Sequence, residues 1–314
     1  VAEEMSYEKI VIVTRKTRLE GLLERFNTVS QAKFYLERAG ADYAAYRAEH
    51  DLYHAVVDRV RRECRTQAPR VHVIERGFLP SYLFTPKDLV VAIGQDGLVV
   101  NTAKYLDGQP LVAVNPDPGT IMGVLLPYRP EQATQAVARV MAGQEGVRAV
   151  TMAEAVLSDG QRLLAFNDLF IGPKSHTSAR YAIRHGDRHE IHSSSGVIVA
   201  TGAGSTGWLS SVFNMAEGLG APHVDPRFPW EADQQRFAVR EPYRSPSTQA
   251  DLVYGELGPG ESLRLESQMA EEGVIFSDGV EADFLQFNAG TFATIQVAGR
   301  KARLAVPSAS AVPA

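Results

Sequence analysis

Short apolar runs alternate with stretches of helical period along the first half of the chain. Four short apolar runs predict strands, at residues 9–14, 71–74, 89–93 and 111–114, and the run at 89–93 has no polar residue, which is typical of a strand buried on both faces. Apolar residues recur near helical spacing over residues 30–63, 99–106 and 132–141. Strands that alternate with helices predict a parallel, doubly wound α/β sheet.

The second half has a different texture. Its apolar segments are short and turn-flanked, at residues 162–166, 179–183, 196–200, 262–265, 273–276 and 298–306. This pattern predicts an antiparallel all-β domain. We expect an α/β domain over residues 1–146, a β-rich domain over 147–290, and a C-terminal segment, 291–314, that packs back on the first domain. The proline-rich stretch 222–247 is interpreted as a long surface excursion.

Composition narrows the class of protein. The 314 residues carry a formal net charge of −5, so no overall basic field exists to hold a nucleic acid, and no nucleic-acid partner is expected. No stretch reaches the roughly 20 apolar residues of a membrane span, and residues 1–4 lack a secretory-signal pattern. The single cysteine, Cys64, is interpreted as lying at an exposed helix end. A reducing, cytoplasmic location without membrane partners is therefore expected.

The first candidate site is Gly94-Gln95-Asp96-Gly97, directly after the third apolar run. In open α/β sheets, ligands bind beyond the carboxyl ends of the strands, and glycines allow a close approach of backbone to ligand. Asp96 is thus well placed to meet a substrate hydroxyl. A simple turn is the alternative interpretation.

The second candidate site is Gly204-Ser205-Thr206-Gly207-Trp208, at a predicted helix start. Its hydroxyls and free amides could bind a phosphate or a ribose, and an ordinary helix cap is the alternative. Arg15, Lys16 and Arg18 form a basic cluster after the first strand, either solvent-facing or phosphate-binding. His185, His189 and His192 are interpreted as a solvated loop rather than a metal site.

Four motifs occur in an order that resembles the NAD kinase family. They are Gly94-Gln95-Asp96-Gly97, Asn167-Asp168, the segment from Thr201 to Trp208, and Asp278-Gly279. The family shows Gly-Gly-Asp-Gly, Asn-Glu, Thr-Gly-Ser-Thr-Ala-Tyr and Asp-Gly in this order, and the resemblance covers nearly the whole chain. The basic segment after the first strand, His50 with His54, and Trp208 in place of tyrosine resemble the mitochondrial-type branch.

The resemblance implies transfer of the ATP γ-phosphate to the 2′-hydroxyl of NAD, giving NADP. Asp96 would be the catalytic base, and Mg²⁺ would accompany ATP, with no metal ligands identifiable in the sequence. The β-rich domain would bind the dinucleotide, and a homodimer or homotetramer is implied. The residues implied in nucleotide binding are Gly94, Gln95, Gly97, Asn167, Asp168, Ser195, Gly204, Ser205, Thr206, Gly207, Trp208, Ser211, Asp278 and Gly279.

Three departures from the family pattern keep alternatives open. Gln95 replaces a glycine, Leu98 replaces a hydroxyl residue, and Ser195 replaces a carboxylate that many bacterial members direct at the dinucleotide. The first two touch the phosphate-donor side, through crowding and through a lost hydrogen bond. The alternatives are a kinase of the same scaffold acting on another nucleotide or nucleoside hydroxyl, and a non-catalytic NAD(P)-binding protein.

Overall fold

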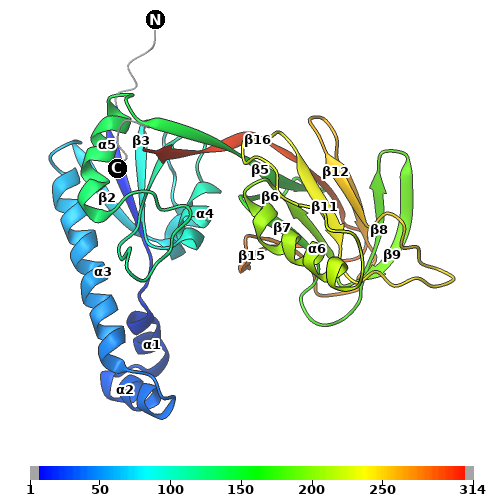
Figure 1. The fold of residues 1–314 in the computed structure, drawn as a ribbon, viewed down its shortest axis with the longest axis horizontal. Helices are drawn as coiled ribbons and strands as arrows, with labels where there is room; N and C mark the ends of the chain where they lie inside the picture. The colour runs from blue at the N-terminus through cyan, green and yellow to red at the C-terminus, as the bar shows by residue number, and fades with distance from the viewer. Residues whose placement is uncertain (1–6, 308–314) are drawn as a thin grey trace, which may run out of the picture. The chain divides into compact units, whose positions relative to one another are not determined.

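The chain divides into two compact units. A computed structural model describes residues 7–307 (Figure 1). Of these, the residues up to Arg148 and those from Arg303 onward form the first unit, and Ala149–Ala302 forms the second. The boundaries lie inside two long strands, β5 (Gly146–Leu157) and β16 (Phe292–Val306). Part of the predicted returning segment 291–314, residues 308–314, lies outside the described residues.

The first unit is built on a parallel sheet. Its order is β2 (Arg70–Glu75), β1 (Lys9–Thr14), β3 (Asp88–Ile93) and β4 (Pro110–Val114), and the end of β16 runs parallel to β4. From β1 the chain passes to β2 at one edge of the sheet, and it then returns to the other side of β1, where β3 and β4 lie. This confirms the predicted doubly wound arrangement.

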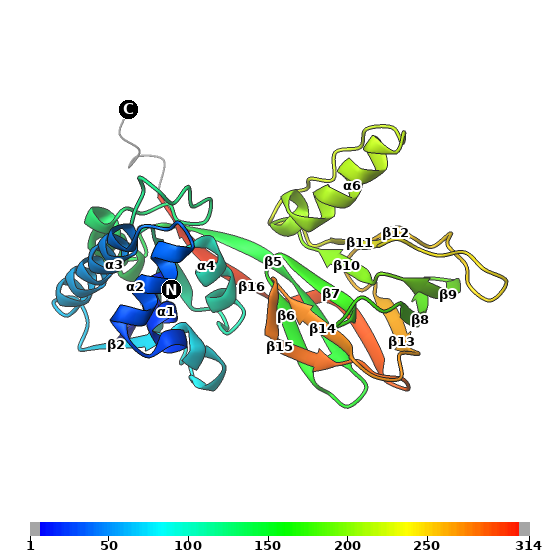
Figure 2. The ribbon, with the colours of Figure 1, turned by 90° about the horizontal axis from the view of Figure 1, so that it is seen from below.

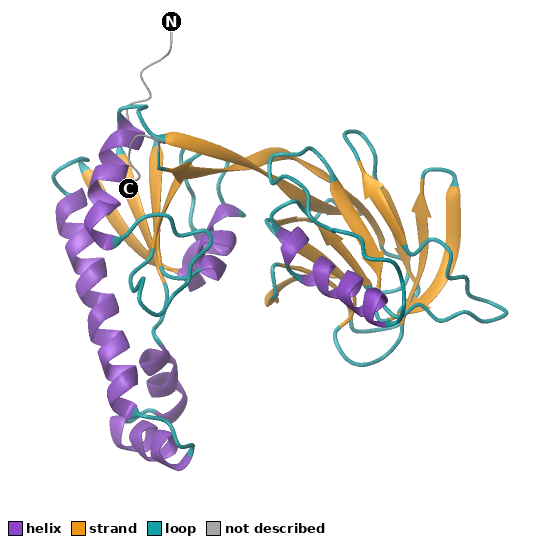
Figure 3. Ribbon diagram, in the orientation of Figure 1, coloured by secondary structure: helices purple, strands orange, loops and turns teal. Residues whose placement is uncertain are grey.

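Helices cover both faces of this sheet, as Figure 3 shows. The helices α3 (Tyr43–Cys64) and α5 (Ala133–Met141), the latter preceded by the short η2 (Pro130–Gln132), share one core with the sheet. On the other side lie α4 (Asp96–Ala103) and η1 (Arg76–Ser81). Every residue of β3 is therefore buried, which explains its unbroken apolar run. Among the described residues, none of the helices is long and apolar enough to cross a membrane.

The stretch predicted to be helical over residues 30–63 is helical, but it is divided into two helices. The segment forms α2 (Val29–Arg38) and α3, preceded by α1 (Arg18–Phe26). Asn27 adopts a left-handed conformation with φ 59° and ends α1, while Thr28 and Asp42 accept N-capping hydrogen bonds. These capping residues interrupt the helix, although the apolar period continues across them.

The second unit contains two packed sheet layers, and the prediction of an antiparallel β domain is confirmed. One sheet has the order β12 (Tyr254–Leu257), β11 (Gln235–Val239), β10 (Val197–Ala200), β7 (Asp168–Pro173), β14 (Gly273–Ser277) and β15 (Val280–Gln286). The facing layer includes β5, β6 (Arg162–Ala165), β8 (Ala179–His185), β9 (Arg188–Ser194), β13 (Leu263–Ser267) and β16. Alternate residues of both layers form one apolar core.

One helix packs on the outer face of the six-stranded sheet. It is α6 (Trp208–Gly218), which follows the short η3 (Gly204–Thr206) and lies against β10 and β11 (Figure 2). Leu209 of α6 is buried together with Ala200 and Ala238 of the sheet. The helix start predicted from the glycine-rich segment is therefore present.

Two interpretations of the second half are wrong. The segment 222–247 is not only a surface excursion, because it contains β11, a sheet-interior strand whose Phe237 is fully buried. Its five residues lie among prolines and are too few to show a clear period. His185, His189 and His192 do not lie in a loop but on the β8–β9 hairpin, where His192 is fully buried and bonded to Glu190 at 2.9 Å.

The interpretation of Cys64 as an exposed residue at a helix end is also wrong, because its side chain is fully buried. It lies one and two helical turns beyond Val60 and Val57 on the apolar stripe of α3, although charged residues surround it in the sequence. Burial raises the pKa of its thiol to about 12. We expect the folded protein to resist labelling by a thiol reagent, and Cys64→Ser to lower the unfolding free energy by about 1–3 kcal/mol. Rapid native labelling, compared with labelling in urea, would contradict this burial.

Candidate functional site

In the first unit, the Gly94-Gln95-Asp96-Gly97 loop joins β3 to α4. The helix begins at Asp96, earlier than predicted, with exposed Gln95 as its N-cap residue. Gly94 is required by packing, because a Cβ there would lie 2.8 Å from Leu98 Cδ2. Gly97 is exposed, and a Cβ there would meet open space. The loop thus places a half-buried carboxylate at the carboxyl end of a central parallel strand.

The Asp96 carboxylate is held by the backbone of a neighbouring loop. Its Oδ1 accepts a hydrogen bond from the Leu125 N–H at 2.9 Å, and its Oδ2 accepts one from the Val124 N–H at 3.0 Å. Together the two bonds fix the direction of the carboxylate. Each oxygen keeps a further lone pair, so the group can still accept a proton from a bound hydroxyl.

A cavity of about 280 Å³ lies at the carboxyl ends of β1 and β3. Strand order reverses between these two strands, which is where open α/β sheets bind ligands. Arg15, Arg18, Glu49, Tyr53 and Gln95 are among its lining residues. Arg15 and Arg18 share Glu49 as their ion-pair partner, at 3.0 and 2.6 Å. The basic cluster therefore divides, because Lys16 pairs instead with Glu24 on α1.

The two residues of the first unit that depart from the family pattern, Leu98 and Gln95, lie in different environments. Leu98 is only 2% exposed and packs beneath Gly94, so its side chain is part of the core rather than of an open surface. Gln95 is exposed and lines the cavity. Neither side chain closes the loop against a ligand.

In the second unit, the Asp278 carboxylate joins two distant motifs. It accepts hydrogen bonds from three consecutive N–H groups, those of Phe166, Asn167 and Asp168, at 3.1, 2.7 and 3.2 Å. Asp278 and Gly279 have φ values of 56° and 68° and form the tight turn between β14 and β15. The residue is thus both a hairpin turn and the anchor of the Asn167-Asp168 segment.

A third motif joins the same junction. The Thr201 hydroxyl donates to the Asn167 carbonyl at 3.1 Å and accepts from the Gly204 N–H at 3.2 Å. A Cβ on Gly204 would lie 2.0 Å from the Asn167 carbonyl oxygen, so only glycine fits there. The motifs at 167–168, 201–207 and 278–279 therefore meet in the second unit.

The hydroxyl side chains of the glycine-rich segment differ in accessibility. Ser205 is 1% exposed and donates to the Gly202 carbonyl at 2.7 Å, while Ser211 donates to the Trp208 carbonyl at 2.7 Å. These two hydroxyls serve the local backbone. Thr206 and Gly207 are exposed at the start of α6 and are open to a ligand.

Asp168 is a buried carboxyl group close to another one. Burial, reinforced by the negative charge of Asp278, raises the pKa of Asp168 from its usual 3.8 to about 7. The folded chain therefore holds this proton more tightly than the unfolded chain does. Near neutral pH the group can both donate and accept a hydrogen bond.

This raised pKa predicts a pH-dependent stability. Between pH 3.8 and about 7 the folded state binds more protons at Asp168 than the unfolded state, so this contribution to stability falls as pH rises. With Asp168→Asn, the unfolding free energy should therefore decrease less as pH rises, by on the order of 1–4 kcal/mol over this pH range. Urea unfolding of both proteins at pH 5 and pH 8 measures the difference. Equal pH dependence in the two proteins would contradict the raised pKa.

A cavity of about 440 Å³ opens on the outer face of the six-stranded sheet. Because side chains alternate along a strand, Asp168 and Phe170 of β7 share this face, while Leu169 and Ile171 enter the core. The Phe170 and Trp208 rings stack with centroids 5.4 Å apart and planes at 9°. Phe276 lies 4.9 Å from Phe170, which completes an aromatic wall.

Sequence reasoning identified Ser195 and Trp208 of this cavity but missed its other members. Lys174 and Arg240 supply positive charge, the latter with its guanidinium carbon 5.2 Å from the Trp208 ring centre. Period-two alternation along β7 and β14 could have revealed the outward phenylalanines. No local pattern marks the two cations, which come from loops that only the tertiary fold brings to this cavity.

Carboxylates line both cavities, Glu49 and Asp117 in the first unit and Glu241 and Glu281 in the second, but none of them belongs to a close group of three possible metal ligands among residues 7–307. The one close group of His, Cys, Asp or Glu side chains that could hold a metal ion there is Glu20, His50 and His54. Its two nitrogen donors do not suit Mg²⁺, which prefers oxygen.

Comparisons with known proteins support one family. No family model matches the chain. NAD kinases of Chlorobaculum tepidum and Mesorhizobium japonicum are 25% and 33% identical over 143 and 138 residues, which is 45% and 43% of this chain. The matched regions cover 47% and 52% of these relatives, so the chain spans about half the length of the curated relatives it matches.

Two solved structures share the fold over nearly the whole chain. Yeast NADH kinase complexed with NADH aligns with a TM-score of 0.58 and 14% identity, over 96% of this chain and 84% of its own. An Archaeoglobus fulgidus NAD kinase in complex with ATP aligns with a TM-score of 0.51 and 18% identity, over 94% and 92%. The chain therefore has the fold of these NAD kinase structures, and part of its sequence is similar to that of the two NAD kinases named above.

Proposed function

We propose that this protein is an NAD kinase-type phosphotransferase, which transfers the γ-phosphate of ATP to the 2′-hydroxyl of NAD or NADH. The observation that carries the proposal is the outer face of the six-stranded sheet. There an aromatic wall and two cations line one cavity of about 440 Å³, and Asp168 lies at the start of β7, two residues before Phe170 of that wall. This combination suits a ligand with planar rings, ribose hydroxyls and phosphates.

In the second unit, each group would have a separate role. Phe170 and Trp208 would pack against a planar base, and Lys174 and Arg240 would meet the pyrophosphate. Asn167 and Asp168 would hydrogen-bond the ribose or base. Their positions depend on the three N–H bonds to Asp278, so this residue would act by positioning rather than by contact.

In the first unit, Asp96 would act as general base. A secondary hydroxyl is a weak nucleophile, and a carboxylate that takes its proton assists attack on the phosphoryl group. The N–H groups of Val124 and Leu125 would hold this carboxylate in its reactive direction. Arg15 and Arg18 would face the triphosphate in the smaller cavity, and the Mg²⁺ that enters with ATP would neutralise phosphate charge.

The identity of the acceptor is the finer part of the proposal. The yeast neighbour was solved with NADH and the archaeal neighbour with ATP, which favours a dinucleotide acceptor and ATP as donor. The mitochondrial-type branch is proposed on the resemblance of the basic segment, His50 with His54, and Trp208. Leu98 is buried and Gln95 leaves the loop open, so neither favours a decayed donor site.

Assembly and location are also part of the proposal. The family resemblance favours a homodimer or homotetramer, which light scattering of the purified chain tests. Cys64 is the only cysteine of the chain, and it suits a reducing compartment such as the cytoplasm.

The direct test is formation of NADP or NADPH from ATP, Mg²⁺ and either NAD or NADH. Arg240→Gln should raise the KM for the dinucleotide by about 10-fold, since it removes a cation from the proposed pyrophosphate site. Arg244→Gln is the matched control, because Arg244 is exposed and pairs with Asp251 outside the cavity. Binding of NAD without turnover would favour a non-catalytic role, and turnover of another nucleotide alone would favour a different acceptor.

A further inference from the structure

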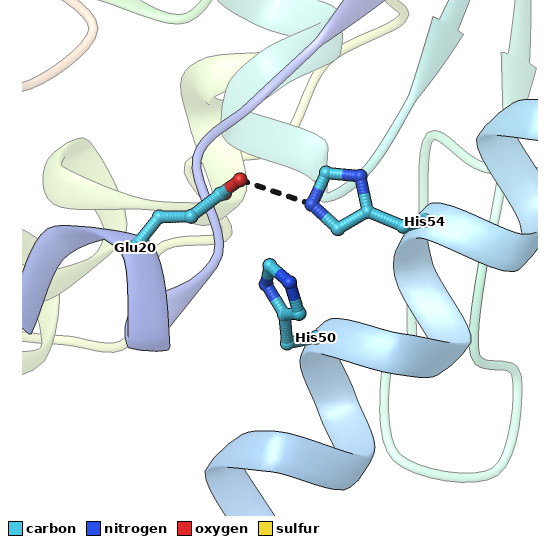
Figure 4. Close-up of side chains that lie close together, drawn as sticks. All are labelled: Glu20, His50 and His54. Carbon is cyan, nitrogen blue, oxygen red and sulfur yellow. Dashed lines mark hydrogen bonds and ion pairs between the residues drawn. The ribbon is translucent and has the colours of Figure 1, made fainter. Parts of the chain in front are cut away.

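A cluster of three metal-binding side chains lies at the junction of α1 and α3, outside both cavities. His50 and His54 lie one helical turn apart on α3, and Glu20 lies on α1 (Figure 4). One potential ligand atom of each residue lies within 4.8 Å of the other two. The Glu20 Oε1 and His54 Nε2 atoms are already 3.0 Å apart.

Thr17 holds two of these side chains in place. Its backbone N–H donates to Glu20 Oε2 at 2.7 Å, which leaves Oε1 directed at His54. Its hydroxyl lies 2.9 Å from His50 Nδ1 and can fix the orientation of that ring. Side chains that bind a metal commonly have such hydrogen-bond partners, which contact the atoms on the side away from the metal and so fix the orientation of the side chain.

The two imidazoles are close but do not bond to each other. Their ring centres are 4.4 Å apart, and His50 Nε2 has no hydrogen-bond partner among residues 7–307. Tetrahedral bonds of about 2.0–2.1 Å would bring the ligand atoms to about 3.3 Å from one another. The three side chains are half-buried, so an ion has access to them from solvent.

We propose that Glu20, His50 and His54 bind one divalent transition-metal ion, of which Zn²⁺ is the best match. Two imidazole nitrogens and one carboxylate oxygen form a known Zn²⁺ donor set, with a fourth position left for water. The ion would join α1 to α3. Both helices also border the smaller cavity of the first unit, through Arg18 and Glu49.

Neighbouring charges do not oppose this assignment. The nearby cations Arg15 and Arg18 are paired with Glu49, and Lys16 is paired with Glu24. The residue after His50, Asp51, bonds instead to Arg47 at 3.0 Å, so it supplies no carboxylate to the ion. The site is thus assigned a binding and stabilising role, without a hydrolytic reaction.

The test uses the full chain without a histidine tag, after treatment with EDTA. Calorimetric titration with Zn²⁺ should show one ion per chain, and Zn²⁺ should raise the midpoint of thermal unfolding. His50→Gln and His54→Gln should each weaken binding by at least about 10-fold. Glu20→Gln should do the same while retaining an acceptor for the Thr17 N–H.

A matched control is present elsewhere in the chain. His223 and Glu217 form a His–carboxylate pair 2.9 Å apart, close to the 3.0 Å of His54 and Glu20, outside the proposed ligand group. His223→Gln should bind Zn²⁺ as the wild type does. Equal affinity in the wild type and the His50 and His54 variants, or absence of saturable binding, would overturn the proposal.

A second readout does not depend on the folding of any variant. Co²⁺ bound to the wild-type chain should give the strong visible absorption of a four-coordinate site, and Zn²⁺ should abolish it by displacement. A weak, six-coordinate spectrum would overturn the assignment. Neither measurement requires kinase activity, so the result is independent of the proposed function.

Discussion

Asp96→Asn is expected to lower NADP formation by about 10²–10⁴-fold, because an amide cannot take the proton of the attacking hydroxyl. The substitution also affects the loop at 124–125. Asn retains one acceptor oxygen for the Val124 and Leu125 N–H groups, whereas its NH₂ group cannot accept the second bond. A modest loss of stability, about 1 kcal/mol, should accompany the loss of activity.

Two measurements separate these effects. The coupled assay gives kcat with NAD or NADH, and thermal unfolding gives the change in stability. Asp42→Asn is the matched control, since Asp42 is a carboxylate of the same unit that also accepts a backbone N–H bond, from Ala44 at 2.8 Å, but does not line the cavity. Retention of more than a tenth of wild-type kcat by the Asp96 variant would contradict the base assignment and leave Asp96 as a loop anchor.

Gly204→Ala should lower the unfolding free energy by about 3 kcal/mol. It should also weaken binding of the dinucleotide. The added Cβ would lie 2.0 Å from the Asn167 carbonyl oxygen, and backbone cannot rotate away as a flexible side chain can. Relief of the clash would displace Asn167 and break its bond from Thr201. Urea unfolding and calorimetric titration with NAD measure the two losses.

Gly218→Ala is the control for this substitution. Gly218 ends α6 and has open space around the position of a Cβ, so alanine there should leave stability unchanged or raise it slightly. If Gly204→Ala unfolded at the wild-type urea concentration and bound NAD normally, the junction would not be as tightly packed as its distances indicate.

Much of the first unit could be predicted from local pattern. A parallel strand with both faces covered must be apolar throughout, so β1, β3 and β4 stand out as unbroken runs. Helix breaks were harder, because capping at Thr28 and Asp42 depends on single polar residues that do not interrupt the apolar period.

The second unit was less predictable in detail. Strands such as β11 and β15 have no clear apolar run, since β11 lies among prolines and β15 carries Glu281 and Asp283, and their burial depends on neighbours far away in the sequence. Cys64 shows the same effect on a helix, since charged neighbours hid a position on the apolar stripe. The candidate residues were nevertheless located by motif, and the structure joins three of the motifs through Asp278 and Thr201.

Local patterns in the sequence were enough to predict the two fold classes and to reveal the ordered motifs and the family that they resemble. These features are local, because they depend on which residues follow one another along a strand or turn. Only the tertiary structure shows which polar groups form internal hydrogen bonds, as Ser205 does, and which line a cavity, as Arg240 does. It alone brought Glu20 beside His54. The physical reason is that burial and hydrogen-bond partners are set by contacts between segments that the chain separates.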